Sequence, residues 1–165
     1  MRSIIFDIDL TLVDTTICEQ ARHERNWALA YSLIPQCKLY EGMEYVFSIL
    51  RKFEIKTCIV STSPRPYIEK LKEQFNIPCQ WIVSYHDAKP IKPHPAQMLK
   101  ALDLMQEDAN NVISFGDRVI DIQAANAANI ESVACFWGTK EKKKLMHSGY
   151  RHAIIQPTEI LTLIR

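Results

Sequence analysis

The sequence has almost no net charge and no long apolar run. Its formal net charge is +1, whereas a broad nucleic-acid surface needs a clear basic excess, so we expect no nucleic-acid partner. No apolar run reaches the length of a membrane span, and the start Met-Arg-Ser is too short, and is followed too soon by Asp7, to form a signal peptide. We therefore expect no membrane partner.

Paired cysteines are also absent. No two cysteines form Cys-x-x-Cys, so neither a disulfide framework nor a zinc site is expected. Cys58 and Cys135 lie in apolar runs, which predicts small core residues, and we expect no reactive role for Cys18, Cys37 and Cys79 either. This cysteine usage favours a reducing, cytoplasmic location.

The composition is that of a globular protein, and the apolar residues form alternating patterns. The 165 residues, 47% of them apolar, suit one domain with a proper core. Continuous apolar runs predict buried strands at residues 3–6, 54–60, 81–83, 111–115 and 132–136. Helical spacing is found at residues 43–53, 64–75, 95–104 and 119–128. The alternation predicts an α/β fold: a three-layer, Rossmann-like α/β/α sandwich with a parallel central sheet.

One stretch interrupts this alternation. Thr16 to Leu33 is a long helical pattern, which predicts a small helical insertion at about residues 15–40 within a single domain of residues 1–165. We expect it to lie over one edge of the sheet. The charged run from Glu141 to Lys144 is predicted to be a solvated helix face.

Polar residues follow the predicted strands, at the edge where open parallel sheets bind ligands. The strand ends carry Asp7, Asp9, Ser61, Thr62, Ser63, Lys92, Asp117 and Asp121. Asp7, Asp9 and Asp117 would form a like-charge cluster that is unfavourable without a cation, and oxygen ligands suit Mg²⁺. A metal, a lysine and hydroxyls together neutralise a phosphoryl group. Ser63 is predicted to cap a helix that begins at Pro64 and directs its positive end to the same edge.

The order of these motifs resembles the haloacid dehalogenase-like hydrolase superfamily over nearly the whole chain. Four stretches resemble its motifs: Phe6-Asp7-Ile8-Asp9-Leu10-Thr11-Leu12, Val60-Ser61-Thr62-Ser63, Lys92-Pro93-His94-Pro95 and Gly116-Asp117-Arg118-Val119-Ile120-Asp121. The family often has glycine where this chain has Leu10. The resemblance implies a phosphatase with a small helical cap.

The resemblance also implies catalytic roles. Asp7 would be the nucleophile that forms an aspartyl-phosphate, and Asp9 would donate and then accept the proton. Ser61 and Lys92, with Thr62 nearby, would hold the phosphoryl oxygens. Lys89 also precedes a proline but lacks the following His-Pro, so Lys92 is assigned the role.

A metal set follows from the same resemblance. Asp7, Asp117 and the backbone carbonyl of Asp9 would ligate Mg²⁺, with Asp121 a ligand or a support for one. Substrate contacts would come from the small cap, where the residues to watch are Arg22, His23, Arg25, Trp27 and Lys38. Exposed aromatics such as Trp27 and Trp137 would support a homodimer.

Four functions compete. The first is hydrolysis of a phosphomonoester of a small metabolite. A dehalogenase would need neither Asp9 nor the metal carboxylates. A phosphomutase of this family carries a cap histidine where the chain has Glu19. A non-catalytic phosphate-binding module would be expected to lose one of the reactive residues, and all are present.

Overall fold

The computed structural model describes residues 1–165 and has a six-stranded parallel sheet at its centre. The strand order is β5-β4-β1-β6-β7-β8. Their bounds are β1 Ser3–Phe6, β4 Thr57–Val60, β5 Trp81–Val83, β6 Val112–Gly116, β7 Glu131–Cys135 and β8 His152–Ile154. The chain builds outward from β1 first on one side and then on the other, so the topological switch point lies at β1 and β6.

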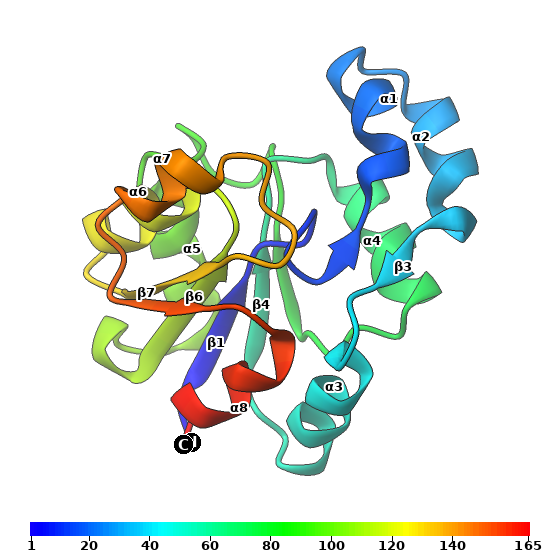
Figure 1. Cartoon of the computed structure of the whole chain (residues 1–165). Helices are drawn as coiled ribbons and strands as arrows, with labels where there is room; N and C mark the ends of the chain where they lie inside the picture. Colours follow the sequence, from blue (N-terminus) through cyan, green and yellow to red (C-terminus); the bar gives the residue numbers. More distant parts are fainter.

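Helices cover both faces of this sheet (Figure 1). One face packs against α3 (Met43–Lys52), α4 (Arg65–Gln74) and α8 (Ile160–Leu163). The other packs against α5 (Ala96–Met105) and α6 (Val119–Ala127), and α7 (Lys142–Met146) packs beside α6. This is the predicted three-layer α/β/α sandwich.

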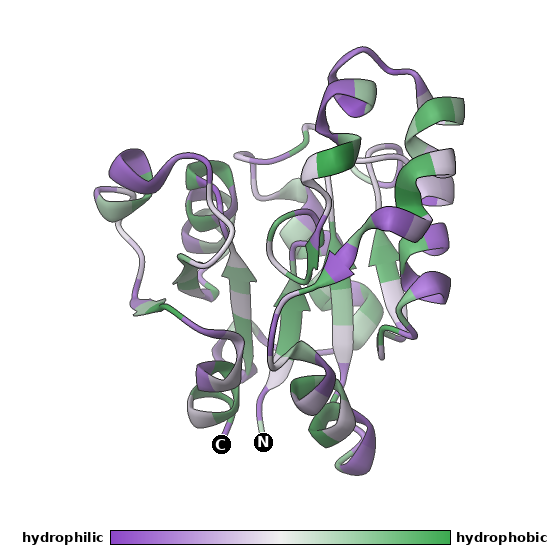
Figure 2. Ribbon diagram, turned by 45° about the vertical axis from the view of Figure 1, so that its right-hand side comes forward, coloured by the Kyte–Doolittle hydropathy of each residue, from purple (hydrophilic) through white to green (hydrophobic).

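The period of two in β1 explains why both faces are apolar. Ile4 and Phe6 belong to the core with α3 and α4, whereas Ile5 belongs to the core with α5 and α6. Figure 2 shows apolar colour along the strands and polar colour on much of the helix surface. The five predicted strands are confirmed, and β8, a short strand at the sheet edge, was not predicted.

The predicted helical pattern over Thr16 to Leu33 is helical in the structure but is not one continuous helix. The stretch forms a short helix η1 (Thr16–Cys18), α1 (Glu19–His23) and α2 (Trp27–Leu33), followed by η2 (Ile34–Gln36). Arg25 takes a left-handed φ of 55°, and the Asn26 side chain accepts a hydrogen bond from the Leu29 N–H at 3.2 Å, which starts α2 anew.

We call residues 15–40 the helical segment. The strand just before it, β2 (Val13–Asp14), pairs with β3 (Lys38–Leu39) near its end as a two-stranded sheet. Figure 1 shows α1 and α2 side by side next to α4. The ring of Trp27 lies 5.6 Å from that of Tyr67 on α4. The segment therefore stands beside the carboxyl ends of β1 and β4.

Burial corrects one prediction and supports another. Trp27 and Trp137 are half-buried against the core, so they are not the exposed aromatics that a homodimer was expected to use. All five cysteines are buried and free, although the sulfurs of Cys18 and Cys37 lie 3.5 Å apart. No helix combines the length and the apolar character needed to cross a membrane.

Candidate active site

The predicted reactive residues gather at the carboxyl ends of β1, β4 and β6, which we call the catalytic rim. Asp7 follows β1, and its N–H bonds the Phe115 carbonyl of β6 at 3.0 Å. Ser61 follows β4, and its N–H bonds the Val83 carbonyl of β5 at 3.0 Å. The sheet ladder thus fixes the backbone on which the reactive side chains stand.

Three carboxylates crowd together at this rim. Oxygens of Asp7, Asp117 and Asp121 all lie within 4.8 Å of one another. Burial, opposed by Lys92, raises the pKa of Asp7 to about 6, and burial beside Asp7 raises the pKa of Asp117 well above its usual range. Both shifts show that the cluster disfavours its own negative charge.

The bonding of Asp117 indicates which kind of ion the carboxylate cluster would bind. Its Oδ1 accepts a hydrogen bond from the Thr11 hydroxyl at 3.0 Å, whereas its Oδ2 is buried and has no partner. An unpaired buried carboxylate oxygen is costly. Oxygen-only donors around such an atom fit a hard divalent cation, so the set is suited to Mg²⁺.

Lys92 is the one cation buried within the rim. Its Nζ donates to Asp121 Oδ1 at 2.6 Å, to Asp7 Oδ1 at 2.9 Å and to the Val60 carbonyl at 3.0 Å. Burial would lower its pKa, but Asp121 and Asp7 raise it above the usual lysine range, so the ammonium stays charged. Lys89, by contrast, is exposed and lies over the Tyr85 ring.

The two hydroxyl residues after β4 occupy different places. Ser61 is 1% exposed, and its Oγ accepts a hydrogen bond from the Ser63 N–H at 3.0 Å, which leaves its own proton free to be donated. Thr62 lines a pocket at this rim, whereas Ser61 is not part of its lining. Thr62 is therefore a wall residue of the pocket, and Ser61 is buried outside that lining.

Asp9 is surrounded by donors. Its Oδ1 accepts from the hydroxyls of Thr15 and Tyr67, each at 2.7 Å. Its Oδ2 accepts from the Ser63 hydroxyl at 3.2 Å and lies 3.2 Å from an Arg22 guanidinium nitrogen. These four partners come from the helical segment and the start of α4, and they hold the carboxylate in one orientation.

Two features of this shell differ from the sequence prediction. Ser63 is not the helix cap, because its hydroxyl bonds Asp9 and the N-cap position is Pro64. Tyr67 was missed, since a tyrosine at helical spacing between apolar residues reads as core. It is indeed fully buried, but burial beside Asp9 raises its pKa well above the usual value, so the phenol keeps the proton it donates.

The carboxylates and Lys92 form part of the wall of a 280 Å³ pocket, the catalytic pocket. The pocket is lined by Asp7, Asp9, Leu10, Glu19, Arg22, His23, Thr62, Lys92, Asp117, Arg118, Asp121, Lys140 and Glu141. Glu141 was predicted to be solvated, but its carboxylate accepts from the Val119 N–H at 3.0 Å at the start of α6. Leu10 takes a left-handed φ of 62°, the conformation that glycine adopts most easily.

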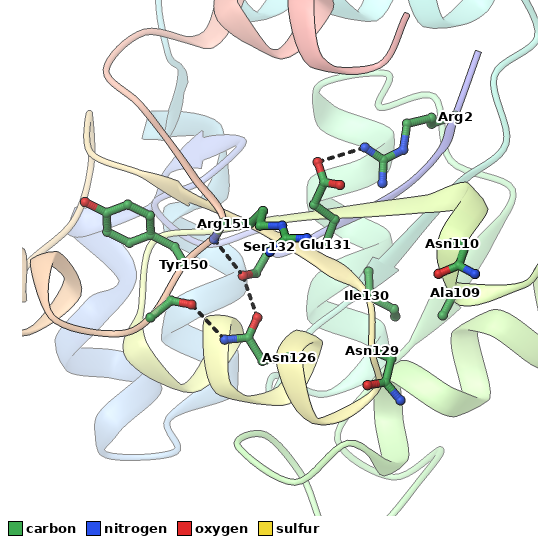
Figure 3. A pocket seen from close by; sticks show the side chains of 11 residues that line it. Arg2, Ala109, Asn110, Asn126, Asn129, Ile130, Glu131, Ser132, Tyr150 and Arg151 are labelled. Carbon is green, nitrogen blue, oxygen red and sulfur yellow. Dashed lines mark hydrogen bonds and ion pairs between the residues drawn. The ribbon is translucent and has the colours of Figure 1, made fainter.

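A separate polar cavity of 490 Å³ lies at the opposite, amino-terminal ends of the strands (Figure 3). Its side chains bond chiefly to one another: Arg2 pairs with Glu131 at 2.8 Å, and the Ser132 hydroxyl donates to Asn126 at 2.7 Å. It contains none of the predicted site residues. The catalytic rim therefore remains the candidate active site.

Comparisons with known proteins show the family to which this chain is related. A family model described as haloacid dehalogenase-like hydrolase matches residues 19–135. A protein of Bacillus mycoides named pyrophosphatase PpaX is 30% identical over 112 residues, which are 64% of this chain and 50% of that protein. The Bacillus cereus protein of the same name is 29% identical over 117 residues, 66% of this chain and 52% of that protein. The chain spans 50 to 59% of the length of such curated relatives.

Solved structures share the fold across almost the whole chain. A predicted phosphoglycolate phosphatase from Haemophilus somnus has a TM-score of 0.87 at 17% identity and covers 100% of this chain and 98% of its own. A hydrolase from Pseudomonas syringae has a TM-score of 0.83 at 20% identity, with 99% and 98% covered.

Proposed function

The chain belongs to the haloacid dehalogenase-like hydrolases, and from that membership and the rim geometry we propose that it is a Mg²⁺-dependent phosphatase acting on a phosphomonoester of a small metabolite. The observation that carries the proposal is the position of Asp7, at the pocket wall, between the buried ammonium of Lys92 and the unpartnered oxygen of Asp117. A carboxylate held there can attack phosphorus while cations neutralise the phosphoryl oxygens.

Two displacements would complete the reaction. Asp7 attacks phosphorus, the bond from phosphorus to the leaving oxygen breaks, and Asp9 gives that oxygen its proton. Asp9 then takes a proton from a water molecule that attacks the aspartyl-phosphate, which releases inorganic phosphate and restores Asp7. The four partners of Asp9 direct its carboxylate toward the pocket through both steps.

The remaining rim residues would bind and orient. Lys92 holds a phosphoryl oxygen as a permanent cation, and Ser61 and Thr62 donate hydroxyl protons to the others. Mg²⁺ would be held by Asp7, Asp117 and the Asp9 backbone carbonyl, and would neutralise phosphoryl charge. Both carboxylate oxygens of Asp121 are already bonded, to Lys92 and to the Arg118 N–H at 3.0 Å, so we assign Asp121 the role of positioning Lys92.

The helical segment would act as the cap. Arg22 and His23 of α1 line the catalytic pocket, and Glu19 is another member of its wall. Lys38 of β3 does not line the catalytic pocket, so it would make no contact with a substrate bound there.

The proposal is tested by phosphate release from p-nitrophenyl phosphate with and without Mg²⁺. The wild-type protein should turn over only with the metal, and Asp7→Asn should abolish turnover while leaving the circular dichroism spectrum unchanged. A matched control is Asp103→Asn, since the Asp103 side chain is 80% exposed on α5. Equal turnover by the wild-type protein and Asp7→Asn would exclude the mechanism.

A further inference from the structure

A second cavity opens beside the catalytic pocket, between the helical segment and the loop after β5. It has a volume of 340 Å³ and is lined by Arg22, His23, Arg25, Trp27, Thr62, Ser63, Pro64, Tyr85 and His86. No acidic side chain is among them, whereas six line the catalytic pocket: Asp7, Asp9, Glu19, Asp117, Asp121 and Glu141. The second space therefore has cationic side chains without the carboxylates of the first, and we call it the basic cavity.

Arg22 stands at the boundary of the two spaces. It lines both of them, together with His23 and Thr62. One terminal nitrogen of its guanidinium lies 3.2 Å from Asp9 Oδ2, and its carbon lies 6.0 Å from the centre of the Tyr67 ring. Its position is thus fixed by an anion on one side and an aromatic face on the other.

The bonding of Arg22 is incomplete. Its side chain is only 19% exposed, and its Nε is buried without a hydrogen-bond partner. A guanidinium offers five N–H donors in a planar fork that matches carboxylate and phosphate oxygens. A buried donor left unpaired is unfavourable, so an anionic acceptor beside Arg22 would be stabilising.

The proposed reaction would bring an anionic acceptor within reach of Arg22. Asp9 must approach the leaving oxygen to protonate it, so the leaving group has to depart past Asp9. Arg22 contacts that same carboxylate at 3.2 Å. A group attached within two or three bonds of the leaving oxygen would therefore meet the Arg22 guanidinium at the mouth of the basic cavity.

We propose that Arg22 binds a second anionic group on the substrate, carried by the leaving group. The substrate class is then a small phosphate ester or anhydride with a carboxylate or a further phosphate near the leaving oxygen. This inference rests on the proposed phosphatase function. It assigns substrate selection to the helical segment and the chemistry to the rim.

The test is a matched pair of substrates, 3-phosphoglycerate and glycerol 3-phosphate, which differ by a carboxylate in place of a hydroxymethyl group. With Mg²⁺, the wild-type enzyme should favour the acid by about 10- to 100-fold in kcat/KM, the range of a charge-assisted hydrogen bond. Arg22→Gln should reduce the preference to roughly 3-fold or less, and Arg22→Lys should retain part of it.

The preference ratio is the informative quantity, because the loss of the Arg22 contact to Asp9 affects both substrates alike. Arg51→Gln is the matched control, since Arg51 on α3 lies outside both spaces and bonds the Asn76 carbonyl at 3.0 Å. Where turnover of the pair is too slow, their inhibition constants against p-nitrophenyl phosphate give the same ratio.

The outcomes separate the two proposals. An enzyme that hydrolyses p-nitrophenyl phosphate but treats the pair equally, or keeps its preference in Arg22→Gln, overturns the inference alone. An enzyme that is inert toward every phosphate ester, folded and with Mg²⁺, removes the proposed function and this inference with it. A preference that is lost only in the Arg22 variants supports both.

Discussion

The catalytic rim and the helical segment meet at Asp9, but they hold their charged side chains in different ways. At the rim, Asp117 and Lys92 are 0% and 4% exposed, and sheet hydrogen bonds fix the strand ends that carry the reactive groups. In the segment, Arg22 is on α1, a helix of five residues that is far too short to be stable alone. The order of the strands thus positions the rim residues, whereas packing against α4 positions the helical segment.

This contrast separates the residues that carry out the reaction from those that select the substrate. A change at the rim disturbs groups that bond to the phosphoryl centre itself, so it should affect every substrate. A change at Arg22 of the segment removes a contact to Asp9, which should affect every substrate alike. It also removes the proposed anion contact on the leaving side, which should affect some substrates more than others.

Asp117→Asn should remove most of the activity. The variant keeps the side-chain shape but loses the charge at the orphaned Oδ2, so we expect turnover to fall by roughly 10³-fold or more. Mg²⁺ should raise the Tm of the wild-type protein but not that of the variant, because a ligand stabilises a folded protein only when it binds. Steady-state kinetics and thermal unfolding with and without Mg²⁺ check both. An undiminished Mg²⁺ shift in Tm would exclude Asp117 as a ligand.

Gly116→Ala should be the next largest effect. A Cβ at this position would lie 2.4 Å from Asp121 Cβ and 2.6 Å from its carboxylate, so Asp121 would have to leave its place beside Lys92. We expect kcat/KM to fall about 100-fold for all substrates, the cost of displacing a charge-positioning group. Ser114→Ala on the same strand is the control. Near-normal kinetics would show that Asp121 is not needed to position Lys92.

The sequence predicted the rim well because strand order alone brings its residues together. Asp7, Ser61, Lys92 and Asp117 each follow an apolar run or lie in the loop beyond it, and parallel strands end at one edge. No knowledge of side-chain packing was needed to place them. The same argument gave the α/β sandwich and its five main strands.

The segment and the shell of Asp9 could not be predicted in this way. The break between α1 and α2 depends on one left-handed residue, Arg25, that periodicity does not reveal. Tyr67 has the spacing of a core residue and is one, so its hydrogen bond to Asp9 carries no separate signal. Ser63 was predicted to cap the helix, and only the fold shows that its hydroxyl bonds Asp9 instead.

The metal-free protein should lose stability as the pH rises. Asp7 has a folded pKa of about 6, above its ordinary value of 3.8, so between these values the folded state binds more protons than the unfolded state. Stability should therefore fall with rising pH across that window, by on the order of 1–3 kcal/mol. Urea unfolding in EDTA at several pH values measures this slope.

Asp7→Asn is the control for that slope. The variant cannot titrate at this position, so the difference in unfolding free energy between it and the wild-type protein reports Asp7 together with its effect on Asp117. Carboxylates with lowered pKa, such as Glu131 beside Arg2, act in the opposite direction in both proteins and cancel. A difference that does not change with pH would mean that burial does not raise the pKa of Asp7.

Tyr67→Phe tests the contact between the catalytic rim and the helical segment. The change removes one of four partners of Asp9 and leaves the ring that packs against Trp27, so we expect about a 10-fold fall in kcat and about 1 kcal/mol in stability. The preference between 3-phosphoglycerate and glycerol 3-phosphate should not change, because Arg22 is untouched. Tyr45→Phe, at a residue that is 58% exposed, is the control. A change in substrate preference would show that Tyr67 also positions Arg22.

Asn26→Ala should have the smallest effect of these variants, and that effect should be confined to the helical segment. The variant removes the side-chain cap of α2, which costs about 1 kcal/mol in related caps, and the loss should be local to the helical segment. Hydrogen exchange should quicken at Leu29 and Ala30, while kcat for p-nitrophenyl phosphate stays within about 2-fold, because no rim residue depends on that cap. Asn110→Ala, at an exposed asparagine remote from the segment, is the control. A fall in kcat as large as that of Tyr67→Phe would mean that the packing of α2 supports the chemistry, and the division between a catalytic rim and a selective segment would not hold.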